Sequence, residues 1–148
     1  MPSRIVVAVD FSPQSGRALE AAIGLAKDLD VTLVLVHAVP QVNAGVIGPA
    51  PYVVDPLIQE EITQDDAVTL STEWAAKARA QGVETETVVR VGDPQRVVQE
   101  IIDRKDTMMV VVGTHGRTGA KRLVLGSVAE RIVRHSGKPV LVVPSQAK

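Results

Sequence analysis

Four predominantly apolar runs constrain the fold of this chain more than any other feature. They cover residues 5–9, 31–36, 108–112 and 140–143 and are rich in valine and isoleucine. A run without polar alternation is typical of a strand covered on both faces, as in a parallel sheet. The sequence therefore predicts buried strands that alternate with covering helices.

Helix signals occupy the segments between these runs. Ser12 is placed as an N-cap with Pro13 at the first helical position, and this first helix ends near Leu29. Asp55 and Pro56 predict the start of a long, acidic second helix that runs to about Gln81. Gly82 then ends it. Two further helices are predicted, one after Asp93-Pro94 and one over residues 127–135.

Residues 83–91 alternate between apolar or threonine positions and polar ones, which predicts a half-exposed edge strand. Residues 39–56 contain several prolines and glycines, and we expect a long loop there that is functional or mobile. The resulting order βαβαβαβαβ predicts a single α/β domain over residues 1–148, an open doubly wound sheet with helices on both faces. Ligands of such sheets bind beyond the carboxyl ends of the strands.

Composition excludes several classes of function. The chain has no cysteine, which rules out disulfides, zinc–thiolate sites and a catalytic thiol. With 16 basic and 17 acidic residues the net charge is −1, so nothing favours nucleic acid or an anionic membrane as partner. The apolar runs are too short to span a bilayer, and no signal-peptide pattern is seen, so a cytoplasmic location is expected.

The most informative stretch follows the run 108–112. Gly113 and Gly116 lie where a buried strand is predicted to end, and glycine lets the backbone approach a ligand closely. Gly126 and Ser127 open a helix, whose unpaired N–H groups attract anions. Three cations accompany them: Arg117, Lys121 and Arg122. Each feature alone has an ordinary structural explanation, but together they favour a phosphate site. Neither a Walker loop nor the dinucleotide fingerprint occurs.

These residues resemble the universal stress protein family. Its ATP-binding members carry G-x₂-G-x₉-G-S/T, which Gly113, Gly116, Gly126 and Ser127 match in full. The opening Val9-Asp10-Phe11-Ser12 and the closing segment 138–144 are also similar to the family's first and last strands. The resemblance covers nearly the whole chain. It implies a Rossmann-like, adenine nucleotide alpha hydrolase-like sheet of five parallel strands in the order 3-2-1-4-5.

The resemblance also implies a ligand, a partner and a set of contacts. The ligand would be ATP, in a cytoplasmic stress-response regulator that forms a homodimer through its fifth strands. Adenine would lie against Ala8, Val9, Asp10 and Ala38. The phosphates and ribose would contact Val112, Gly113, His115, Gly116, Arg117, Gly126, Ser127 and Val128. Mg²⁺ would be held mainly through the phosphates, because the sequence offers no dedicated carboxylate cage.

The same residues leave other functions open. Asp10 could bind an adenine amino group or only accept hydrogen bonds from its own turn. His115 has no carboxylate or second histidine in its loop to orient it, so no catalytic residue is assigned and at most slow ATP hydrolysis is expected. His37 is interpreted as structural. The alternatives are a protein-interaction module that uses the dimer surface and loop 39–56, or a true nucleotide hydrolase.

Overall fold

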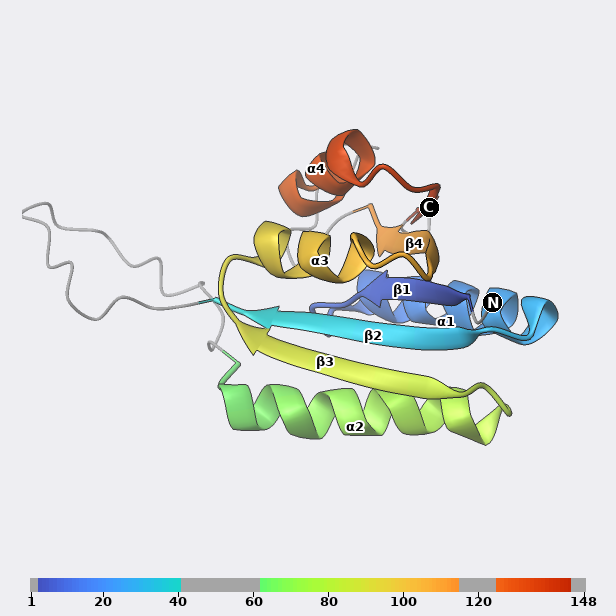
Figure 1. Ribbon diagram of the computed structural model, residues 1–148. Helices are drawn as coiled ribbons and strands as arrows, with labels where there is room; N and C mark the ends of the chain where they lie inside the picture. Colours follow the sequence, from blue (N-terminus) through green and yellow to red (C-terminus); the bar gives the residue numbers. More distant parts are fainter. Residues whose placement is uncertain (1–2, 41–61, 115–124, 145–148) are drawn as a thin grey trace, which may run out of the picture.

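A computed structural model of the chain describes residues 3–40, 62–114 and 125–144. Five parallel strands form one sheet in the order β3-β2-β1-β4-β5, with helices on both faces (Figure 1). The predicted doubly wound α/β fold and the strand order 3-2-1-4-5 are confirmed. The elements in chain order are β1 (Arg4–Ala8), α1 (Pro13–Leu29), β2 (Thr32–Val39), α2 (Gln64–Ala80), β3 (Thr85–Val91), α3 (Pro94–Ile102), β4 (Thr107–Gly113), α4 (Ser127–His135) and β5 (Val140–Val143).

The core has two layers, one on each face of the sheet. On one face α1 lays its apolar side, including Leu19 and Ile23, over the odd-numbered residues of β1 and β2. On the other face α3 and α4 cover the even-numbered residues of β1, β2 and β4. Because β1, β2 and β4 contribute fully buried side chains to both layers, their sequences are apolar without alternation.

The helix α1 begins as its sequence signals predict. Ser12 has an extended backbone, and its hydroxyl accepts a hydrogen bond from the amide of Ser15, while Pro13 occupies the first turn. At the other end Asp30 adopts a left-handed conformation and closes the helix. The start of α1 is therefore fixed, with four residues between it and the end of β1.

Two predictions about the β3 side of the molecule were wrong. The second helix begins at Gln64 rather than near Asp55, because Thr63 caps it by accepting from the amide of Asp66, and Ile62 precedes the helix. The loop expected over residues 39–56 does not include Val39, which ends β2, and residues 41–56 lie outside the described residues. The strand β3 is at the sheet edge, as predicted, and its Val88 packs against the α3 layer.

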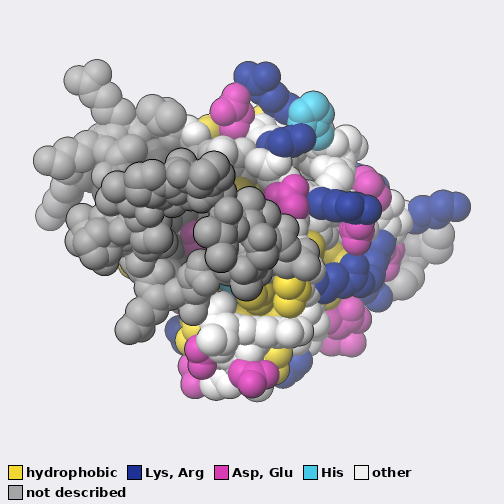
Figure 2. Space-filling model, turned by 90° about the vertical axis from the view of Figure 1, so that its left-hand side faces the viewer, with side chains coloured by type: hydrophobic (Ala, Val, Ile, Leu, Met, Phe, Trp, Pro, Cys, Tyr) yellow, Lys and Arg dark blue, Asp and Glu magenta, His cyan; other side chains and the backbone are white. Residues whose placement is uncertain are grey.

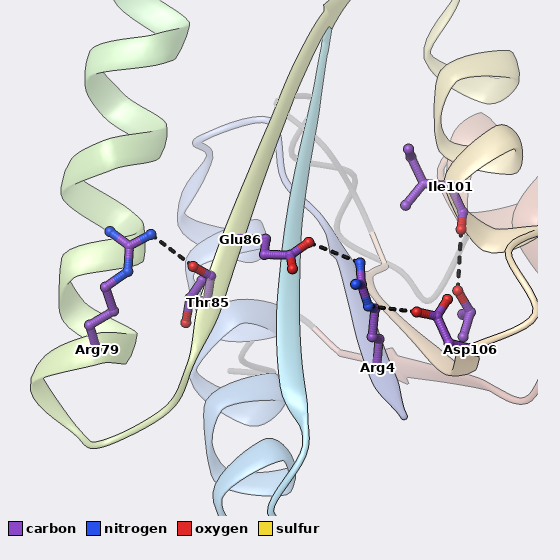
Figure 3. Close-up of polar contacts among 7 residues, drawn as sticks. Arg4, Arg79, Thr85, Glu86, Ile101 and Asp106 are labelled. Carbon is purple, nitrogen blue, oxygen red and sulfur yellow. Dashed lines mark hydrogen bonds and ion pairs between the residues drawn. The ribbon is translucent and has the colours of Figure 1, made fainter. Parts of the chain in front are cut away.

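Polar contacts tie the strands together at the amino-terminal edge of the sheet (Figure 3). Arg4 at the start of β1 pairs with Glu86 of β3 at 2.9 Å and with Asp106, which precedes β4, at 2.7 Å. The hydroxyl of Thr107 donates to the carbonyl of Ile101 at 3.2 Å. These contacts link β1, β3 and the start of β4 at the amino-terminal edge, whereas ligands of doubly wound sheets bind at the carboxyl edge.

Candidate functional site

The strands β1 and β4 separate at their carboxyl ends. Their pairing ends at Val7 and Val111, whereas β4 continues to Gly113 in register with Val143 of β5. After β1 the chain enters α1 on one face of the sheet, and after β4 it leads to α4 on the other. Such a switch point opens a crevice between the two strand ends. Figure 2 shows the molecule from this edge, where basic and acidic side chains are intermixed over the described surface.

The backbone of Ala38 faces this crevice. Val36 accepts a hydrogen bond from the amide of Val9 at 2.9 Å, so the even-numbered residues of β2 direct their polar groups toward β1. The next bond of a parallel ladder would join the Ala38 amide to the Val9 carbonyl. That bond is not formed between these two described residues. One donor and one acceptor of Ala38 therefore point to the space beyond β1.

Asp10 lies two residues beyond the end of β1, and continuing the register of Ala8 with Val36 by two residues would place Asp10 opposite Ala38. Its Oδ1 accepts from the amide of Ser12 at 2.9 Å, and its own amide is 3.3 Å from the hydroxyl of Ser15. Asp10 therefore does accept a hydrogen bond from its own turn, but among the described residues only one of its two carboxylate oxygens is used in this way. The second oxygen of this half-buried side chain can still accept a hydrogen bond.

The start of α4 lies beside the end of β4. Gly126 has an extended backbone with φ −59° and ψ 157°, and its amide donates to the carbonyl of Thr114 at 2.6 Å. That amide is already used, so the α4 amides without a partner among the described residues are those of Ser127, Val128 and Ala129, which precede the first intrahelical bond from Glu130. Ser127 is exposed and adds its hydroxyl.

Gly113 has a structural reason to be glycine. A Cβ atom at this position would lie 3.1 Å from the backbone oxygen of Gln14 in the first turn of α1. Close packing of β4 on α1 thus requires the missing side chain. The glycine holds the two elements that flank the crevice near each other, whether or not a ligand approaches it.

The structure brings together some of the predicted contacts and leaves others undescribed. Asp10, Ala38 and Gly113 share one edge, and Gly126, Ser127 and Val128 open α4 there. The side chains of Ala8, Val9 and Val112 belong to the core, so these residues offer only backbone groups. His115, Gly116 and Arg117 lie outside the described residues.

Two aromatic residues near the end of β1, His37 and Phe11, had no functional role predicted from the sequence. His37 is buried, and its Nδ1 lies 2.8 Å from the Val9 carbonyl oxygen. Phe11 has a left-handed backbone with φ 64° and places its ring 4.6 Å from that of His37. Trp74 of α2 meets Phe11 edge-on at 5.1 Å. A bulky residue beside Asp10 and a histidine at the end of a buried strand were the only signals available.

Two further findings concern metals and membranes. No group of three or more histidine, aspartate or glutamate side chains that could hold a metal ion occurs within residues 3–40, 62–114 and 125–144. Over the same ranges, none of the helices has the length and apolar character needed to cross a membrane.

Comparison with known sequences decides the family. The profile described as "Universal stress protein family" matches residues 1–144. The chain belongs to the universal stress protein family. It is 31% identical over 149 residues to the universal stress protein YxiE of Bacillus subtilis, covering 97% of this chain and 99% of that one. It is 32% identical over 150 residues to MJ0531 of Methanocaldococcus jannaschii, covering 98% and 84%.

Solved structures of universal stress proteins share the fold. One of them, described as a universal stress protein in complex with cAMP, superposes with a TM-score of 0.69 at 26% sequence identity. The likeness covers 95% of this chain and 96% of the other. An adenine nucleotide is thus found on a universal stress protein of the same architecture.

Proposed function

We propose that this universal stress protein binds an adenine nucleotide in the crevice between β1 and β4 and acts as a regulatory module. The observation that carries the proposal is the backbone of Ala38, whose N–H and C=O on the β1 side have no partner among the described residues, at the point where β1 and β4 separate. An N–H and a C=O in this arrangement complement the N1 acceptor and the amino group of adenine. The similar protein in complex with cAMP supports a ligand of this class.

The phosphates would lie at the start of α4. The amides of Ser127 and Val128 and the hydroxyl of Ser127 offer donors at a positive helix end. We take ATP to be the ligand because Gly113, Gly116, Gly126 and Ser127 complete the family's ATP-binding motif. Mg²⁺ would then bind mainly through the phosphates, and His115, Gly116 and Arg117 would complete the contacts.

Regulation rather than turnover is the activity we propose. Asp10 already accepts a hydrogen bond from Ser12, and its position suits recognition of a base better than activation of water at a phosphate. Slow hydrolysis would accompany binding at most. We further propose a cytoplasmic homodimer that pairs through β5, an edge strand with partly exposed apolar side chains.

Calorimetric titration of the nucleotide-stripped chain with Mg-ATP, compared with Gly126→Val, tests the proposal. The backbone angles of Gly126 are open to any residue, so valine should not strain the fold while its side chain enters the phosphate site. Gly24→Val is the matched control, because a side chain there meets nothing within 4 Å on the exposed side of α1. We expect binding by wild type and Gly24→Val and its loss in Gly126→Val. Full affinity in folded Gly126→Val would exclude this phosphate site.

A further inference from the structure

The peptide that joins Val9 to Asp10 is held in an unusual way. The Val9 amide continues the ladder by donating to Val36, yet the Val9 carbonyl does not accept from Ala38. Instead it is 2.8 Å from Nδ1 of His37. A carbonyl oxygen only accepts, so Nδ1 carries the proton and donates it. The histidine side chain has taken the place of the next ladder bond.

The bond from His37 to the Val9 carbonyl has a direct consequence for the backbone of Ala38. If His37 did not occupy the Val9 carbonyl, the ladder between β1 and β2 could close by one more step. The Ala38 amide would then be paired with Val9 and would be lost to any ligand. The imidazole satisfies a buried carbonyl, and the neighbouring Ala38 N–H is left without a hydrogen-bond partner among the described residues.

Aromatic contacts fix the ring of His37 in this position. Phe11 lies 4.6 Å from it, and Trp74 supports Phe11 from α2 at 5.1 Å with the rings nearly perpendicular. Among the described residues, Phe11 and Asp30 are the non-glycine residues with positive φ. Asp30 closes a helix, where such a conformation is common, but a left-handed phenylalanine persists only when its surroundings enforce it.

We propose that His37 is a positioning residue of the nucleotide site, which keeps the Ala38 amide available to the base by occupying the Val9 carbonyl. This inference rests on the proposed function and adds to it the residue that sets the geometry of base recognition. The base edge it serves presents an acceptor to the Ala38 amide and a donor to the Ala38 carbonyl. His37 itself does not touch the ligand.

Amide hydrogen exchange of the wild-type chain, followed by NMR, tests the proposal without any substitution. In the absence of nucleotide, the Ala38 amide should exchange at least about tenfold faster than that of Val36, which is paired inside the ladder. Addition of AMP should slow exchange at Ala38. Equal protection of the two amides without nucleotide would overturn the proposal.

Substitutions at His37 give the second arm of the test. His37→Leu removes the donor, so the Ala38 amide should become protected and the Kd for AMP should rise by about tenfold. His37→Asn keeps an N–H donor near the position of Nδ1, and its Kd should stay within about threefold of wild type. Thr107→Val is the matched control, because it removes a buried hydrogen bond to a backbone carbonyl at the start of β4, at the opposite edge of the sheet.

The outcomes separate the two proposals. If wild type fails to bind AMP and Mg-ATP, the proposed function and the role of His37 both fall. If wild type binds AMP and folded His37→Leu binds it equally well, only the role of His37 is overturned. A loss of affinity in Thr107→Val as large as that in His37→Leu would likewise reduce the effect to general destabilisation.

Discussion

Gly113 lies where β4 passes the first turn of α1, and its replacement by alanine is expected to weaken the fold. The added Cβ would come 3.1 Å from the backbone oxygen of Gln14, and backbone on both sides resists adjustment. We expect Gly113→Ala to lower the free energy of unfolding by about 1–3 kcal/mol, the usual cost of overpacking. Urea unfolding followed by circular dichroism measures this change.

Gly24→Ala serves as the control for that prediction. Gly24 is in the middle of α1, and a Cβ there meets nothing within 4 Å. Alanine should therefore raise the free energy of unfolding by roughly 0.5–1 kcal/mol through helix propensity. If both alanine variants were stabilised, close packing of β4 on α1 would not be the reason for glycine at position 113.

At Asp10 a single substitution can separate folding from ligand binding. Asn retains an oxygen that accepts from the Ser12 amide, so the turn before α1 should survive Asp10→Asn. The other carboxylate oxygen becomes an NH₂ group, which cannot accept from an adenine amino group. We expect the free energy of unfolding to change by less than about 0.5 kcal/mol and the Kd for Mg-ATP to rise by about tenfold.

Thermal unfolding and calorimetry on the same Asp10→Asn sample provide the two readouts. A variant that binds Mg-ATP like wild type would show that Asp10 serves only its own turn. A variant that unfolds at a lower temperature but binds Mg-ATP normally would also show that Asp10 stabilises its turn and does not contact the ligand.

At the scale of elements, α2 carries a buried polar group that its packing does not satisfy. Ser71 is only 1% exposed, and its hydroxyl has no hydrogen-bond partner among the described residues. Ser71→Ala should therefore raise the free energy of unfolding by about 1 kcal/mol, because it removes an unsatisfied hydroxyl and improves helix propensity. Urea denaturation measures the effect.

Thr107 serves for comparison, because its buried hydroxyl does form a hydrogen bond. Its buried hydroxyl donates to Ile101 at 3.2 Å, so Thr107→Val should lower the free energy of unfolding by about 1 kcal/mol. A loss of stability in Ser71→Ala comparable to that in Thr107→Val would mean that the Ser71 hydroxyl does have a partner in solution.

Elements with local start and stop signals were predicted well from the sequence. The bounds of α4 and β5 agree with the predicted ranges 127–135 and 140–143, and Ser12 caps α1 as expected. The start of α2 was missed because the pairs Asp55-Pro56 and Asp93-Pro94 look alike in the sequence; α3 does begin at Pro94, whereas α2 begins at Gln64. The cap at Thr63, with acidic Asp65 and Asp66 in the first turn, was the competing signal.

The residues of the candidate site could be predicted from the sequence, but the backbone N–H and C=O groups available to a ligand could not. The sequence places Asp10, Ala38 and Gly113 at strand ends, and parallel strands bring those ends to one edge. Which backbone groups remain unpaired depends on the parity and length of the ladder. The bond from His37 to Val9 joins residues 28 positions apart, so no local pattern could reveal it.

At the scale of the whole molecule, the two edge strands differ in how readily they could pair with a strand of another chain. The sheet ends at β3 on one side and at β5 on the other. Val91 of β3 is 47% exposed and Leu141 of β5 is 36% exposed, so both edges carry an apolar side chain that contacts solvent in the single chain. Ion pairs of Arg90 with Glu100 and of Arg4 with Glu86 add charges beside β3, and charge near an edge discourages strand pairing.

The proposed homodimer through β5 leads to a prediction that compares these edges directly. Leu141→Lys places a charge at the centre of the proposed interface and should shift the chain from dimer to monomer in sedimentation equilibrium. Val91→Lys makes a similar exchange on β3 and should leave the dimer intact. Each side chain is already partly exposed, so neither variant should lose more than about 0.5 kcal/mol of monomer stability. Dissociation by Val91→Lys alone would place the interface on β3, and a wild-type monomer would remove the dimer from the proposal while leaving the crevice between β1 and β4 unchanged.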